Sequence, residues 1–248
     1  MSDKELAGRV AVITGAGRSI GRAMALELAS AGAAVVVNVR SNRAEADAVV
    51  KEIESKGGKA MAVLADVVDA AAVNAMAEAA LKKFGRIDYL VNNAALRQEK
   101  SIEHMSFEDW RHITGVVLDG AFHCVKACLP AIENSDAGSI INVGGLTGAM
   151  GAPDRVHVVT AKAGIAGFTR GLAMELAPHK ITVNTLVPAM LAKPDKPNEI
   201  PPHPIYRPLL GRAAWPTDIA PLARFLVGPG ARYITGQLVN VNGGTYFH

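Results

Sequence analysis

Short apolar runs alternate along the chain with longer segments in which apolar residues recur at helical spacing. The short runs are apolar at nearly every position, which is typical of parallel strands that helices cover on both faces. Seven runs fit a strand, at residues 10–14, 34–38, 60–64, 87–92, 139–143, 182–186 and 237–241. The alternation predicts an α/β fold with one doubly wound, parallel sheet of about seven strands and helices on both faces.

Local signals set the bounds of two helices. Asn42 followed by Glu45 indicates a capping box before a helix over residues 44–56. Gly85 is a typical stop for a helix over residues 70–84. In a sheet of this kind, ligands are expected beyond the carboxyl ends of the strands.

Composition favours one soluble domain. Half of the 248 residues are hydrophobic and no linker divides them, so we expect residues 1–248 to form a single domain. The net charge of +3 is small and its basic residues are dispersed, which argues against a nucleic-acid or membrane-surface partner. No segment suits a signal peptide or an uninterrupted membrane span, so we expect a cytoplasmic location. Cys124 and Cys128 lack partners at metal-ligating spacing, and we predict buried thiols and no metal site.

A glycine-rich turn follows the first strand. Residues 14–21 read Thr-Gly-Ala-Gly-Arg-Ser-Ile-Gly and lead directly into helical periodicity. Glycines permit a tight turn and close backbone approach, so that the free N–H groups of the helix start can meet an anion. The order of strand, glycine turn and helix predicts a site for the pyrophosphate of a dinucleotide.

This turn resembles the Thr-Gly-x-x-x-Gly-x-Gly pattern of the short-chain dehydrogenase/reductase family. Further family motifs follow in order along nearly the whole chain: Asp66, the Asn-Asn-Ala-Ala run at 92–95, Lys162-Ala163-Gly164, Pro188, Gly236-Gln237 and Gly243-Gly244. The resemblance implies a Rossmann-like domain, an oxidoreductase activity on a small carbonyl or alcohol substrate, and a nicotinamide cofactor.

The resemblance also implies roles for individual residues. Asp66 would hold the adenine edge, the Asn92 region would pass under the adenosine ribose, Lys162 would donate to the nicotinamide ribose, and Pro188 would line the nicotinamide pocket. For Asp66 a helix cap is the alternative. The candidate cofactor residues are Gly15, Arg18, Ser19, Ile20, Gly21, Arg40, Ser41, Asp66, Val67, Asn93, Ala94, Lys162 and Pro188.

Cofactor choice is indicated at the end of the second strand. A protein that selects NAD commonly places a carboxylate there against the ribose 2′-hydroxyl. Arg40 follows this strand instead, and Arg18 approaches from the glycine turn. Guanidinium groups suit a 2′-phosphate, so we predict NADP(H) in preference to NAD(H). The alternative is that both arginines are surface groups near a nucleotide site.

The catalytic positions depart from the family pattern. The resemblance implies a tyrosine four residues before the lysine, a serine just after the fifth strand and an asparagine in the fourth long helix. Those places hold Val158, Gly145 and Val117, and only Lys162 remains. A missing general acid lowers a rate by roughly 10²–10⁴. The usual route for the proton is therefore not expected.

We expect His157 to be the replacement acid or base, with Asp154 three residues earlier to orient it. The alternatives are that Asp154 caps the helix and that His157 lies in a wet groove. Thr147 and Thr160 are minor hydroxyl candidates, although Thr160 points toward a different helix face from Val158. Asp119 and His123, four residues apart, are interpreted as a local surface pair.

Substrate contacts are expected from a proline-rich cover over residues 188–212, which is a stiff, irregular segment rather than a helical lid. Arg97 begins a polar run, 97–100, that lines the substrate mouth or is a solvated loop. Together with Arg155 these groups favour a polar or anionic substrate.

Three functions remain open. The first is an atypical NADP(H)-dependent oxidoreductase with a non-standard proton donor. The second is a non-redox lyase, isomerase or hydrolase on the same fold, and the third is a catalytically inactive nucleotide-binding partner. The resemblance further implies a homo-oligomer, a tetramer or a dimer, built by the helices that begin near Ser106 and Asp154.

Overall fold

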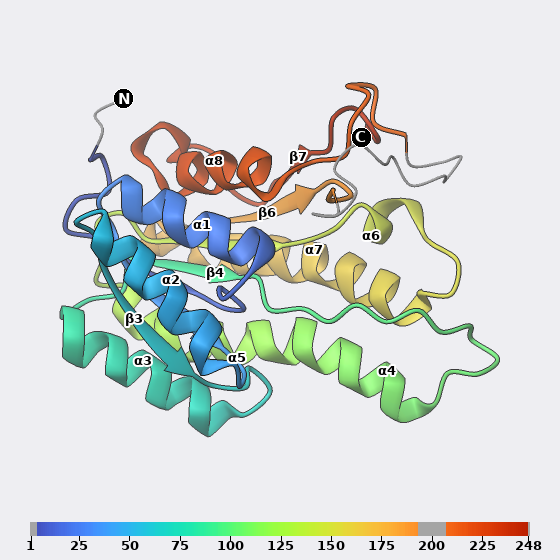
Figure 1. The fold of residues 1–248 in the computed structure, drawn as a ribbon, viewed down its shortest axis with the longest axis horizontal. Coiled ribbons are helices and arrows are strands. Elements are labelled where there is room, and N and C mark those ends of the chain that lie inside the picture. Colours follow the sequence, from blue (N-terminus) through green and yellow to red (C-terminus); the bar gives the residue numbers. More distant parts are fainter. Residues whose placement is uncertain (1–3, 193–206, 248) are drawn as a thin grey trace.

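The computed structural model describes residues 4–192 and 207–247 (Figure 1). Within them the chain forms one seven-stranded, wholly parallel sheet in the order β3-β2-β1-β4-β5-β6-β7. The strands are β1 (Val10–Ile13), β2 (Ala34–Val39), β3 (Lys59–Leu64), β4 (Tyr89–Asn92), β5 (Ser139–Val143), β6 (Thr182–Pro188) and β7 (Leu238–Val241). All seven predicted strands are confirmed, and so is the doubly wound fold.

Helices cover both faces of the sheet. The main ones are α1 (Ser19–Ser30), α2 (Arg43–Ser55), α3 (Ala70–Phe84), α4 (Phe107–Thr114), α5 (Gly120–Ile132), α7 (Val156–Leu176) and α8 (Pro216–Val227). One buried cluster joins α1, α2 and α8 to the sheet, and a second joins α3, α5 and α7 to it. Figure 1 shows α1 and α8 side by side on the first face. The core is therefore two apolar layers with the strands between them.

Side-chain caps explain where two helices begin. The Asn42 side chain accepts a hydrogen bond from the Glu45 N–H, which is one half of the predicted capping box, and α2 begins one residue before the predicted start. Asp69 caps α3 by accepting from the N–H groups of Ala71 and Ala72. Gly85, with a φ of 78°, ends α3 as predicted.

One long helical segment runs from Phe107 to Ile132. It begins with a capping box between Ser106 and Asp109 and contains a π-helical turn, Gly115–Asp119, between α4 and α5. The segment is long and apolar enough to cross a membrane, contrary to the expectation that no segment reaches that length. Half of its most apolar window is buried within the fold, as in the core helix of a soluble domain.

Short helices complete the chain at α6 (Thr147–Met150), Ala177–His179 and Pro229–Ala231. Helix α6 follows β5 directly and lies against α7 (Figure 1). Because β5 ends at the carboxyl edge of the sheet, α6 stands beside the expected ligand site.

Candidate functional site

The carboxyl ends of β1, β4 and β5 surround a small recess. The strand order reverses here, since β1 is followed along the chain by β2 on one side and pairs with β4 on the other. This is the topological switch point at which open α/β sheets bind ligands. The recess is lined by Thr14, Val67, Asn92, Ala94, Val116, Val117, Gly120, Ala121, Val143, Lys162 and Ile165.

Hydrogen bonds of Thr14 and Asn93 fix the glycine turn to the end of β4. The Thr14 hydroxyl accepts from the N–H groups of Asn93 and Ala94, both at 3.0 Å. The Asn93 side-chain amide donates to the carbonyl oxygens of Thr14 at 2.8 Å and Gly15 at 3.0 Å. A Cβ on Gly21 would lie 2.3 Å from the Gly15 oxygen and 2.5 Å from the Asn93 Nδ2. The turn and the start of α1 are thus packed too closely for any side chain at 21.

The N-terminus of α1 is open. No side chain caps it, and the first backbone bond within the helix runs from the Arg22 N–H to the Arg18 oxygen. Arg18 and Ser19 are exposed, whereas Ile20 and Gly21 are buried and offer only their backbone. Uncapped N–H groups at a helix start, with the positive end of the helix dipole, form an anion site.

Ser19 stands where the Thr-Gly-x-x-x-Gly-x-Gly pattern has its second glycine. Its φ is 51°, in the left-handed region that glycine occupies readily and other residues rarely do. The match to that pattern is therefore incomplete, and the turn carries local backbone strain.

Gly17, the residue before Arg18, packs against the end of β2. A Cβ on Gly17 would lie 2.8 Å from a methyl group of Val39, the residue before Arg40. Arg40 and Ser41 are exposed, and neither arginine forms an ion pair with any residue in the described ranges. One carboxylate is near, because the Glu45 Oε2 lies 3.2 Å from the same Cβ position.

Asp66 and Val67 follow β3. The Asp66 carboxylate accepts from the Val68 N–H at 3.2 Å, and Asp69 is the cap of α3. The helix-cap alternative for Asp66 is therefore wrong, and its second oxygen has no partner among the residues described. Val67 is buried and lines the recess.

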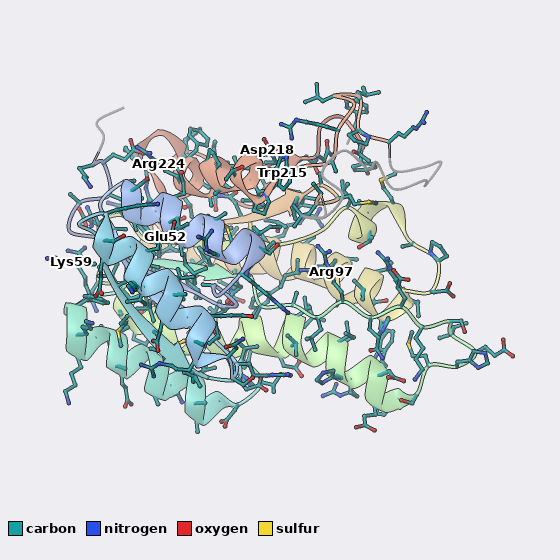
Figure 2. The ribbon with its side chains drawn as sticks, in the orientation of Figure 1. Glu52, Lys59, Arg97, Trp215, Asp218 and Arg224 are labelled. Atoms are coloured by element: carbon teal, nitrogen blue, oxygen red, sulfur yellow. The ribbon has the colours of Figure 1, made fainter. Side chains whose placement is uncertain are left out.

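Lys162 extends from α7 into the recess. Its Nζ donates to the Val143 oxygen at 2.6 Å, which is the one hydrogen bond that this group makes within residues 4–192 and 207–247. Burial, together with the nearby Arg97 guanidinium, lowers the pKa of Lys162 to about 8. In Figure 2 Arg97 lies beside α7, the helix that carries Lys162. The lysine thus exchanges its proton near neutral pH.

Apolar side chains occupy the neighbouring positions. Val117, in the π-helical turn, is buried, and Val158 packs on a cluster that contains Ile113, Ala161 and Ile165. Neither side chain can donate or hold a proton. Gly145 offers no side chain where β5 ends.

The structure does not bring the predicted catalytic trio together. His157 is fully buried, and neither ring nitrogen has a hydrogen-bond partner among the described residues, Asp154 included. Asp154 is exposed with a φ of 55° and precedes α7, which begins at Val156, so it shares no helical stripe with Lys162. The five residues from His157 to Lys162 turn the helix by about 140°. The predicted wet groove around His157 and helix cap at Asp154 are also wrong.

Other predicted polar groups have partners of their own. The His123 Nδ1–H donates to the Val67 oxygen at 3.1 Å, and Asp119 lies 3.6 Å from Arg111. They are therefore not paired with each other.

The loop after Arg97 is anchored to the start of α7, since the Lys100 N–H donates to the Asp154 oxygen at 2.7 Å and Glu99 pairs with Arg155.

The proline-rich cover lies mainly outside the described residues. Pro188 ends β6 and is half-buried, and a parallel bridge joins Leu191 to Ala214. Residues 193–206 of the predicted cover fall outside the structural description.

Across the described ranges, no three His, Cys, Asp or Glu side chains gather where they could hold a metal ion.

Thr147, a minor hydroxyl candidate in the sequence, lies near Gly145. It begins α6, is partly exposed, and lies 3.8 Å, measured to its Oγ1, from the position of a Cβ on Gly145. The signal available in the sequence was Gly148, the next residue, which permits α6 to touch α7.

Comparisons with known proteins agree with this geometry. Residues 15–246 match the family model described as enoyl-(acyl carrier protein) reductase. The 3-oxoacyl-[acyl-carrier-protein] reductase of Synechocystis sp. is 42% identical over 241 residues, 96% of this chain and 97% of that protein. A blue fluorescent protein from a metagenomic library, solved in complex with NADPH, has a TM-score of 0.90 at 31% identity, covering 97% of this chain and 99% of its own. A short chain dehydrogenase from Burkholderia cenocepacia, solved in complex with NADP, has the same TM-score and coverage at 30% identity.

Proposed function

The chain belongs to the short-chain dehydrogenase/reductase family of oxidoreductases, and from this premise we propose that it reduces a small carbonyl substrate with NADPH. The observation that carries the proposal is the anion site at the open end of α1, with two unpaired arginines beside it and Lys162 at the other end of the recess. A nicotinamide dinucleotide has its phosphates at one end and its hydride-donating ring at the other. Both sets of groups lie at the carboxyl edge of the sheet, where a dinucleotide binds in folds of this kind.

The chain's own residues fit the cofactor chemically. The N–H groups at the start of α1 would bind the pyrophosphate, Asp66 the adenine and Lys162 the nicotinamide ribose. Gly15, Ser19, Ile20, Val67, Asn93, Ala94 and Pro188 would shape the remainder of the site. When bound, the reduced nicotinamide supplies the hydride. Residues of the protein position it and handle the proton.

NADP(H) is favoured over NAD(H) by charge. Arg18 and Arg40 are exposed and free of carboxylate partners among the residues described, so both guanidinium groups are available to a 2′-phosphate. Glu45 opposes this preference from the first turn of α2. Two cations against one carboxylate leave the site positive, and Ser41 adds a hydroxyl beside them.

The route of the proton is proposed to be non-standard. We infer that Val158, Gly145 and Val117 replace the tyrosine, serine and asparagine of the family pattern. His157, oriented by Asp154, was the donor expected from sequence, but its burial and its lack of hydrogen bonds favour Lys162 over it. The substrate is a 3-oxoacyl thioester or a similar ketone, by analogy with the name of the Synechocystis relative.

Calorimetric titration with NADPH and NADH, before and after Arg40→Ala, tests the cofactor assignment. We expect NADPH to bind at least tenfold more tightly than NADH, and Arg40→Ala to remove most of that difference. Arg43→Ala is the matched control, because Arg43 is also exposed but is paired with Asp47 at 2.9 Å. A preference that survives Arg40→Ala unchanged contradicts the 2′-phosphate role.

The reaction is tested by a screen of carbonyl substrates that begins with short 3-oxoacyl thioesters. Turnover is measured as the loss of NADPH absorbance. Binding of NADPH without turnover of any carbonyl would favour the inactive nucleotide-binding partner. Absence of any binding would favour the non-redox alternative, which no feature of the structure supports at present.

We also propose a cytoplasmic homo-oligomer, a tetramer or a dimer. The helices expected to associate carry large exposed apolar side chains, with Phe107 at 77% and Phe122 at 50% on α4 and α5, and Met174 at 81% on α7. Association of these helices would remove those apolar side chains from water. Light scattering should give the mass of two or four chains, and a monomer at micromolar concentration contradicts the proposal.

A further inference from the structure

Helix α6 touches α7 at Lys162. A Cβ on Gly148 would lie 2.7 Å from the Lys162 carbonyl carbon and 2.9 Å from the Ala163 nitrogen. Real Cβ atoms do not approach backbone so closely, so only glycine permits this contact. The contact places Thr147, the first residue of α6, beside the lysine side chain.

The space in front of Gly145 is shared by two polar residues. A Cβ on Gly145 would lie 3.8 Å from the Thr147 Oγ1 and 3.7 and 3.9 Å from the Lys162 Cγ and Cδ. These distances are ordinary van der Waals contacts, so the space is open enough for a small side chain. The Thr147 hydroxyl makes no side-chain hydrogen bond with the residues that the structure describes.

Lys162 reaches the same space, and no tyrosine among the described residues stands between it and the substrate, because Val158 occupies the tyrosine position of the family pattern. Its Nζ is held by the Val143 oxygen, and Val158 one turn earlier in α7 cannot relay a proton. An ammonium group has three N–H donors, of which the Val143 oxygen takes one. Two remain for the ribose of a cofactor and for a substrate oxygen.

From this geometry we propose that Thr147 donates the hydrogen bond that holds the substrate carbonyl oxygen, and that the Lys162 ammonium itself delivers the proton. The inference rests on the proposed function and adds the two groups that complete it. The reduced nicotinamide, when bound, would supply a hydride to the carbonyl carbon, and the C=O π pair would move to the oxygen. That oxygen takes a proton from Nζ as the N–H bond breaks. The ketone is reduced to an alcohol, the cofactor is oxidised, and neutral Lys162 regains its proton from water.

Thr147→Val tests the hydroxyl because it removes one donor and keeps the branched shape. We expect kcat for carbonyl reduction by NADPH to fall by roughly 10²–10³, the usual effect of losing one donor to a developing oxyanion. KM and the calorimetric affinity for NADPH should change by less than threefold. Thr147→Ser, which keeps the hydroxyl, should stay within about tenfold of the parent.

Gly145→Ser in the Thr147→Val background separates chemistry from packing. The contacts at Gly145 leave room for a serine, and its hydroxyl would enter the space that Thr147 serves. We expect this second hydroxyl to recover at least tenfold of the lost kcat, which a purely structural effect of Thr147→Val would not allow.

The outcomes distinguish this inference from the function on which it rests. A parent protein that reduces carbonyls while Thr147→Val keeps its full kcat overturns the role of Thr147 alone. A Thr147→Val protein that loses NADPH affinity in parallel with kcat also overturns it, because the residue then acts on the cofactor. A parent that neither binds NADPH nor reduces any carbonyl overturns both proposals together.

Discussion

Replacing Gly21 with alanine tests the architecture of the cofactor turn. The added methyl carbon would lie 2.3 Å from the Gly15 carbonyl oxygen, 2.5 Å from the Asn93 Nδ2 and 2.9 Å from the Ala16 Cα. Two of these three atoms belong to the backbone, so rotation of one side chain cannot remove the overlap. Either the turn must move away from α1, or the Asn93 side chain must move and lose its hydrogen bonds to Thr14 and Gly15.

The magnitude follows from the bonds at risk. The Asn93 amide makes two hydrogen bonds, to the oxygens of Thr14 and Gly15, each with a net value of about 0.5–1.5 kcal/mol. Overpacking a filled site costs about 1–3 kcal/mol more. We therefore expect Gly21→Ala to lower the free energy of unfolding by about 2–6 kcal/mol. In a chain of this size each kcal/mol shifts Tm by about 2–4 °C.

Thermal unfolding followed by circular dichroism, with and without NADPH, is the assay. Gly21→Ala should lower Tm by at least about 4 °C and weaken NADPH binding at least tenfold. Gly167→Ala in α7 is the matched control, since nothing lies within 4 Å of its Cβ position and alanine favours a helix by roughly 0.5–1 kcal/mol. A Gly21→Ala protein that melts with the parent and binds NADPH equally well would refute the close packing of the turn.

Three further changes probe single residues. Above pH about 8 Lys162 is mostly neutral, so kcat/KM for reduction should fall with rising pH. Arg97→Gln removes the positive charge that helps to lower the pKa of Lys162, and it should move this fall in kcat/KM to higher pH. A kcat/KM that does not change with pH would exclude the lysine as proton donor. Ser19→Gly relieves a left-handed φ and should raise the free energy of unfolding by about 0.5–1 kcal/mol, with weaker NADPH binding if the hydroxyl contacts phosphate. His157→Leu removes a buried ring without partners among the described residues and should stabilise by about 1–2 kcal/mol in urea titration; loss of activity with gained stability would restore His157 as a catalytic residue.

The fold was predictable because its signals are local. Each strand is a short apolar run between helical segments, and the runs at 139–143 and the helix at 70–84 matched the structure to the residue. Parallel sheets buried on both faces permit few other patterns. The cofactor turn was predictable for the same reason, since its strand, glycines and helix start are contiguous in sequence.

The catalytic end of the site was not predictable, because its contacts are made across elements. His157 was expected to be a replacement acid or base, with a wet groove as the alternative, but the ring is fully buried on the face of α7 that carries Ala161 and Ile165. Helical periodicity places a residue on a face and does not tell which faces a neighbouring helix will cover. The π-helical turn itself left no sign in the hydrophobic pattern.

Gly148 shows why one small residue can direct chemistry at a distance from the motifs. The backbone of α6 reaches α7 only because position 148 has no Cβ, and that contact sets the Thr147 hydroxyl beside the one titratable group in the recess. A site that lost its tyrosine and serine but kept ordinary spacing here would have no hydroxyl near the lysine. Lys162, the open space at Gly145 and the close α6–α7 contact therefore form one arrangement, in which the hydroxyl that we propose for the substrate comes from the helix between β5 and α7.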